Sequence, residues 1–118
     1  MNLSQPNWQK ITRLVLLSRE LDQLEVNQLA PQGKVKYQFS SGGHELAQIL
    51  LAQALSHPHD AAAVYYRSRP FMLACGLSAA EALAAGMGRK SILHQGRDAG
   101  VVFNMPRREG LTILPSSG

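Results

Sequence analysis

Residues 40–55 have the sequence SSGGHELAQILLAQAL, in which small polar residues give way to a largely apolar run. The apolar side chains occupy most of the circumference of a helix, which predicts a central, buried helix after the glycines. Glycines at positions 42 and 43 would let the backbone approach a ligand, and a helix N-terminus attracts negative charge. Two interpretations of His44 are open: it belongs to a polar helix start, or it lines a functional site.

A long amphipathic helix is predicted on the N-terminal side of this stretch. Asn7 is placed to cap a helix that begins at Trp8, and apolar residues recur in steps of three and four from Ile11 to Leu24. Pro31 ends the pattern. A helix of this kind serves packing or a subunit interface, and it carries no sign of catalysis.

Three short extended segments are predicted in the rest of the chain. Strict alternation over Lys34–Phe39 predicts a strand with aromatic side chains on one face. Val64–Arg67 predicts a second extended segment, and Leu111–Leu114 predicts a short buried strand. Residues 89–110 have an irregular pattern with three glycines, which predicts a long loop.

Two further helices are predicted between these segments. The apolar residues from Phe71 to Cys75 indicate one or two helical turns, broken by Gly76. Ser78 and Glu81 have the spacing of a capping box, in which each side chain bonds the backbone amide of the other residue. An alanine-rich helix should therefore begin here and continue through Ala85.

Composition and charge exclude several classes of function. The chain has 118 residues, of which 45% are hydrophobic and 17% charged, as in globular proteins. The net charge is +4, but the basic residues are scattered, so the stripe that nucleic-acid binding needs is missing. The apolar runs are shorter than the roughly 20 residues that cross a bilayer, and no secretory signal is recognisable, so no membrane association is expected. The one cysteine, Cys75, should be a small buried hydrophobe, which fits a reducing, cytoplasmic setting.

Arg67 is a further candidate for ligand binding on chemical grounds. Its guanidinium is permanently charged, and its planar set of donors suits a phosphate. Tyr66 adds a hydroxyl donor and Arg69 could assist, whereas the alternative is a surface arginine beside a half-buried tyrosine. His57 and His59 have no third ligand nearby, so a solvated turn is favoured over a metal site.

The order of the motifs adds a resemblance to a known family. SSGGHELAQ at residues 40–48 is followed by VYYR at residues 64–67, by the small-residue helix with a Leu-Ser-x-x-Glu start, and by Gly96-Arg97-Asp98 at the head of a long loop. This order is similar to that of the alpha subunits of thiamine-diphosphate-dependent 2-oxo acid dehydrogenases, especially the bacterial branched-chain type. The similarity extends from about residue 10 to the end of the chain.

The resemblance implies a fold. The chain would be mostly α-helical as it stands and would form the N-terminal part of an α/β thiamine-diphosphate-binding fold. Residues 1–32 would be an N-terminal amphipathic helix, and residues 33–118 an incomplete cofactor-binding domain. The family's magnesium-binding Gly-Asp-Gly motif does not occur in the 118 residues. The resemblance therefore assigns no metal ligand and no catalytic residue to this chain.

The resemblance also implies a reaction and partners. Enzymes of this family oxidatively decarboxylate a 2-oxo acid and transfer the acyl group to a lipoyl group, using thiamine diphosphate and magnesium. The partners would be a beta subunit and a lipoyl-bearing acyltransferase. The side chains implied at the cofactor are Tyr65, Tyr66, Arg67, Ser116 and Ser117, and those implied at the substrate pocket are Tyr37, Phe39 and His44.

The isolated chain is expected to bind thiamine diphosphate weakly or not at all and to have no turnover, because a diphosphate without its metal is poorly held. Two alternatives are open. The chain could be a non-enzymatic helical interaction module, or it could be a fragment of another thiamine-dependent transferase.

Overall fold

The computed structural model describes residues 5–35, 38–55, 57, 59–89, 105–108 and 111–114, the last two ranges by their backbone. These residues are mostly helical, as expected from the sequence. The helices are α1 (Trp8–Leu24), the π-helical turn η1 (Glu25–Leu29), α2 (Glu45–Ala54), α3 (Arg69–Ala74) and α4 (Ala79–Gly86). The strands are β1 (Ala61–Ala63), β2 (Met105–Arg108) and β3 (Leu111–Leu114).

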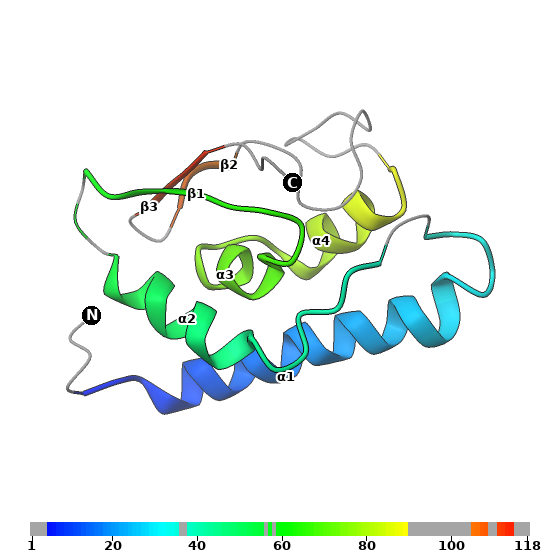
Figure 1. Cartoon of the computed structure of the whole chain (residues 1–118), viewed down its shortest axis with the longest axis horizontal. Coiled ribbons are helices and arrows are strands. Elements are labelled where there is room, and N and C mark those ends of the chain that lie inside the picture. Colours follow the sequence, from blue (N-terminus) through cyan, green and yellow to red (C-terminus); the bar gives the residue numbers. More distant parts are fainter. Residues whose placement is uncertain are drawn as a thin grey trace.

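The helices share one core. Helix α1 runs along one side of the molecule and packs against α2, α3 and α4, while the strands lie on the opposite side (Figure 1). Helix α3 is the centre of this packing, because every one of its six residues is buried. The core side chains come from all four α-helices and include Ile11, Leu21, Ile49, Phe71, Met72, Leu73, Ala82 and Ala85.

Local sequence signals set the helix boundaries. The Asn7 side chain accepts a hydrogen bond from the Lys10 amide at 3.1 Å and caps α1, as predicted. At the start of α4 both bonds of the capping box are present between Ser78 and Glu81. Gly76 has a φ of 105°, a left-handed conformation that favours glycine, and it separates α3 from α4.

Helix α2 begins and ends where the sequence predicts, but the expectation that it is buried on most sides is wrong. Only Glu45, Ile49 and Ala52 are buried in this helix. Leu46 and Leu51 are exposed by 49% and 54%. The reason is that α1 and α3 pack against one side of α2, and no described element covers the leucines.

The strands form a small sheet in the order β1-β3-β2. Strand β3 pairs in parallel with β1 and antiparallel with β2. The strand predicted over Leu111–Leu114 is therefore confirmed, but β2 lies inside the loop predicted for residues 89–110. The proline at position 106 weakens the strand signal of this segment, and its pairing with β3 supplies the backbone partners that a local pattern does not reveal.

Two predictions of extended structure also need correction. The described residues of the segment 34–39 are outside any strand, so the predicted alternating strand is not formed there. The extended segment predicted at Val64–Arg67 is not a strand: strand β1 ends at Ala63, directly before it, and residues 66 and 67 form a turn.

Candidate functional site

A tight turn carries the predicted diphosphate-binding residues. The Ser68 amide donates to the Tyr65 carbonyl at 2.9 Å, which makes Tyr66 and Arg67 the central residues of a β-turn. The Ser68 hydroxyl accepts from the Tyr65 amide at 3.1 Å and closes the turn a second time. The turn connects β1 to the start of α3, and it presents both central side chains outward from the core.

Phe39, Tyr66 and Arg67 form one aromatic and cationic cluster. The ring centroids of Phe39 and Tyr66 are 4.5 Å apart. The guanidinium carbon of Arg67 lies 5.8 Å from the Phe39 centroid and 5.5 Å from the Tyr66 centroid, which is within cation–π range. Phe39 is 41% exposed and Tyr66 37% exposed, so a solute can reach the cluster. Tyr65 extends it, because its ring packs edge-on against Tyr66 at 5.3 Å.

The backbone and side chain of Arg67 are both anchored. One guanidinium nitrogen of Arg67 donates to the Ser40 carbonyl at 2.6 Å. The Arg67 carbonyl accepts from the Ser41 hydroxyl at 2.7 Å and from the Gln48 side-chain amide at 3.0 Å. Gln48 also accepts from the Phe71 amide at 3.2 Å, so α2 ties the turn to α3. These bonds tie the Arg67 carbonyl and one of its guanidinium nitrogens to the segment 40–41 and to α2.

Arg67 differs in its charge partners from Arg19 and Arg69, which both form ion pairs with carboxylates. Arg19 forms an ion pair with Glu45 at 2.7 Å, and Arg69 forms ion pairs with Asp22 and Glu25. Within the described part of the chain, Arg67 has no carboxylate partner. A half-buried guanidinium without a counter-ion attracts an anionic ligand, which is the chemistry predicted for this position.

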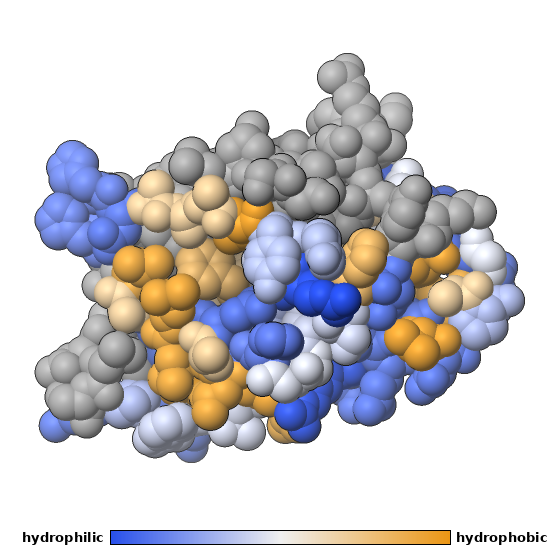
Figure 2. All heavy atoms as spheres, viewed as in Figure 1, coloured by the Kyte–Doolittle hydropathy of each residue, from blue (hydrophilic) through white to orange (hydrophobic). Residues whose placement is uncertain are grey.

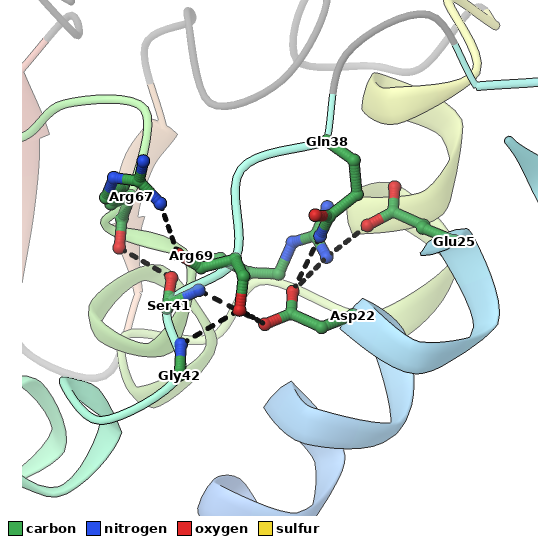
Figure 3. A network of polar contacts seen from close by, with 8 residues as sticks. Asp22, Glu25, Gln38, Ser41, Gly42, Arg67 and Arg69 are labelled. Atoms are coloured by element: carbon green, nitrogen blue, oxygen red, sulfur yellow. Dashed lines mark hydrogen bonds and ion pairs between the residues drawn. The ribbon is translucent and has the colours of Figure 1, made fainter. Parts of the chain in front are cut away.

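Arg69 does not assist Arg67, contrary to the expectation from its place in the sequence. It is buried and lies on the other side of the segment 38–41 from Arg67, against Asp22 and Glu25 (Figure 3). Asp22 also accepts from the Gln38 side chain at 3.0 Å. The sequence does not reveal this network, because its members are remote along the chain and the acids lie in an otherwise amphipathic helical stretch.

His44 lies at the rim of a cavity next to the cluster. The cavity has a volume of about 330 Å³, is lined mainly by apolar side chains such as Leu51 and Phe71, and includes Tyr65 in its wall. His44 occupies the cap position of α2 but makes no capping bond with its side chain. His44 lines this cavity and is exposed, and its predicted place at a substrate pocket stays a prediction.

Glu45, the first residue of α2, is a buried carboxylate that helps shape this helix start. Burial acts to raise the pKa of Glu45, but the hydrogen bond from Arg19, the backbone amides of Glu45 and Gly43, and the Arg19 charge outweigh it. These contacts hold the pKa below its ordinary value. The Gly43 amide donates to Glu45 at 2.7 Å, and Gly43 has a φ of 90°, so glycine suits this position.

Several predicted features are elsewhere or outside the described residues. Tyr37, Ser116 and Ser117 lie outside them, so their predicted roles stay predictions. His57 and His59 are exposed in a turn, where the Asp60 side chain accepts from the His57 amide. The described residues contain no group of three or more potential metal ligands. None of the described helices is long and apolar enough to cross a membrane.

Comparisons with known proteins add no relative to these observations. No protein-family model matches the chain, and no curated protein or solved structure is significantly similar to it.

Proposed function

We propose that the turn at Tyr65–Ser68 forms one arm of a diphosphate-binding site, in which Arg67 is the anion-binding residue and Tyr66 its neighbour. The single observation that carries the proposal is the exposed cluster of Phe39, Tyr66 and Arg67, with a guanidinium that has no carboxylate partner among the described residues. The resemblance of the motif order to 2-oxo acid dehydrogenase alpha subunits identifies the diphosphate as that of thiamine diphosphate.

The chemistry of the cluster fits this ligand. A guanidinium has five N–H donors, and the carbonyl of Ser40 uses one of the donors of Arg67. The remaining donors suit two oxygens of a phosphate, and charge-assisted hydrogen bonds of this kind are about twice as strong as neutral ones. Packing against the two rings fixes the plane of the guanidinium and leaves its edge to the ligand.

The wider proposal follows the resemblance. The chain would contribute part of an α/β thiamine-diphosphate-binding fold, which a beta subunit would complete. The reaction would be oxidative decarboxylation of a 2-oxo acid, followed by transfer of the acyl group to a lipoyl-bearing acyltransferase. The parallel pairing of β1 with β3, with α3 and α4 between them in the chain, supports an α/β arrangement. Tyr65, Ser116 and Ser117 would join the cofactor site, and Tyr37, Phe39 and His44 the substrate pocket. The bound cofactor would supply the carbanion chemistry, and these residues would position it.

The test is a titration of the purified 118-residue chain with inorganic pyrophosphate, followed by NMR through the backbone amide signals of the turn at Tyr65–Ser68, which all variants share, and in the wild type also through the side-chain N–H signal of Arg67. We expect weak binding, in the millimolar range, because a single arginine arm gives only part of the affinity of a full site. Magnesium should not strengthen it, since the described residues offer no group of metal ligands.

The matched pair of variants is R67Q and R13Q. Both remove one positive charge, and Arg13 lies exposed on α1, where the residues that line a pocket with it include no member of the cluster. R67Q should abolish the binding and R13Q should leave it within about twofold of the wild type. Equal binding by the wild type and R67Q would refute the proposed role of Arg67. Saturable binding that requires magnesium would refute the expectation of an incomplete site.

A second candidate function is an interaction module, which the exposed apolar side chains of α2 favour. Figure 2 shows apolar side chains gathered on the side of the molecule where α2 lies. Leu46 and Leu51 are large hydrophobic side chains of α2 that are exposed. A mass that rises with concentration and does not respond to pyrophosphate would favour this function. The two functions are compatible, since a subunit that binds a cofactor at an interface needs both surfaces.

A further inference from the structure

We infer that Asp22 is a positioning residue for the anion-binding arm: its carboxylate holds the segment 38–41 so that Ser40 and Ser41 fix Arg67. This inference rests on the proposed function of Arg67, because it assigns a residue that prepares that site. Asp22 lies on α1, 45 positions before Arg67, and no motif of the sequence connects the two.

The carboxylate of Asp22 accepts hydrogen bonds on both of its oxygens. One oxygen accepts from the Ser41 amide at 3.1 Å and from the Ser40 hydroxyl at 3.2 Å. The other accepts from the Gln38 side chain at 3.0 Å and from Arg69 at 3.3 Å. Asp22 is only 7% exposed, so these bonds form away from competing water. Figure 3 shows the carboxylate between α1 and the segment that it holds.

The segment 38–41 holds Arg67 in turn. The Ser40 carbonyl accepts from the Arg67 guanidinium, and the Ser41 hydroxyl donates to the Arg67 carbonyl. The ring of Phe39, on the same segment, lies under the guanidinium. Ser41 is completely buried, so its hydroxyl has a fixed direction. Each of the three contacts requires that the backbone of this segment stays in place, and the contacts of Asp22 with Ser40 and Ser41 hold it there.

The charges around Asp22 agree with a positioning role. Arg69 is buried between Asp22 and Glu25 and pairs with both. Arg69 is therefore the charge partner of Asp22, while Arg67, on the other side of the segment, has no carboxylate of its own in the described residues. Asp22 thus orients Arg67 through hydrogen-bonded neighbours without neutralising its charge.

The experiment compares D22N, S41A and E20Q in the full 118-residue chain. The amide nitrogen of an asparagine cannot accept a hydrogen bond, so D22N removes an acceptor that serves the segment. S41A removes only the hydroxyl that bonds the Arg67 carbonyl. E20Q is the matched control, because Glu20 is exposed on the same helix and the charge change equals that of D22N.

Two readouts separate this inference from the proposed function. The first is the side-chain N–H signal of Arg67 without ligand, measured at a temperature where thermal unfolding shows each variant to be folded. The second is the affinity for pyrophosphate. We expect D22N and S41A to move the Arg67 signal and to weaken pyrophosphate binding by about tenfold, while E20Q changes neither.

An Arg67 signal that stays at its wild-type position in folded D22N would overturn the inference, as would an equal displacement by E20Q. If D22N does not fold, S40A, which removes the Ser40 hydroxyl that donates to Asp22, decides by the same criterion, and an unchanged Arg67 signal in folded S40A would overturn the inference. If the wild type does not bind pyrophosphate, the proposed function fails, but the Arg67 signal without ligand still decides whether Asp22 positions this side chain.

Discussion

Replacement of Gly86 by alanine tests how tightly the buried acid of η1 is held. A Cβ atom added at Gly86 would lie well inside van der Waals contact of the free oxygen of Glu25. Glu25 is fully buried, and its other oxygen is bonded to Arg69. The carboxylate therefore cannot turn away from a new methyl group without weakening that ion pair.

The magnitude follows from two opposing effects. Alanine is favoured over glycine within a helix by about 1 kcal/mol. Overpacking a filled site costs about 1–3 kcal/mol, and weakening a charged hydrogen bond adds about 1.5–3 kcal/mol. The cost of the clash is larger than the gain in helix propensity, so we expect G86A to lower the free energy of unfolding by about 2 kcal/mol. In a domain of this size that corresponds to a lower melting temperature by about 10 °C.

The assay is thermal and urea unfolding followed by circular dichroism, with G86A measured in the wild type and in E25A. Removal of the Glu25 carboxylate removes the clash, and Arg69 keeps Asp22 as its partner. The cost of G86A should therefore disappear in the E25A background. A stabilised G86A, or an equal cost in both backgrounds, would refute the packing of Glu25 against Gly86.

Three further predictions concern single side chains. E45Q should be less stable than the wild type at neutral pH. Because the pKa of Glu45 is lowered in the folded chain, the contribution of this carboxylate to stability is present above its pKa in the unfolded chain. That contribution disappears as the pH falls through its pKa in the folded chain. Melting curves of E45Q and the wild type should thus converge in acid, and a constant difference would contradict the Arg19 contact. S78A should cost about 1 kcal/mol in unfolding experiments, whereas S78T, which keeps the hydroxyl, should cost less; equal costs would contradict the capping box with Glu81. Cys75 is 1% exposed, so a thiol reagent should label it only after denaturant is added, and rapid labelling of the native chain would contradict its burial.

Features set by neighbouring residues could be predicted from the sequence. The cap at Asn7, the capping box at Ser78 and the break at Gly76 each depend on residues within a few positions, and all three are present. The same holds for the limits of α2, whose glycines and following turn are local signals. The closeness of Phe39 to Tyr66 and Arg67 depends on no local signal, and only the structure brings these side chains together.

Features that depend on distant partners could not be predicted. The stripe of apolar residues on α1 indicated its buried face, but Asp22 on α1 and Glu25 at the start of η1 are buried as well. Their burial is possible because Arg69, more than 40 positions away, supplies a charge partner. For the same reason Arg69 looked like a second ligand-binding arginine beside Arg67, since adjacency along the chain does not reveal which way a side chain points.

The central claim is that Arg67 and its aromatic neighbours receive a diphosphate, and a chemical-shift map of the 118-residue chain with thiamine diphosphate tests it most directly. We predict that the largest changes fall on Phe39, Tyr66 and Arg67, with smaller ones at Ser40 and Ser41. Changes confined to other surfaces, such as the exposed side of α1 around Trp8, or no change at Arg67 at millimolar ligand, would contradict the claim.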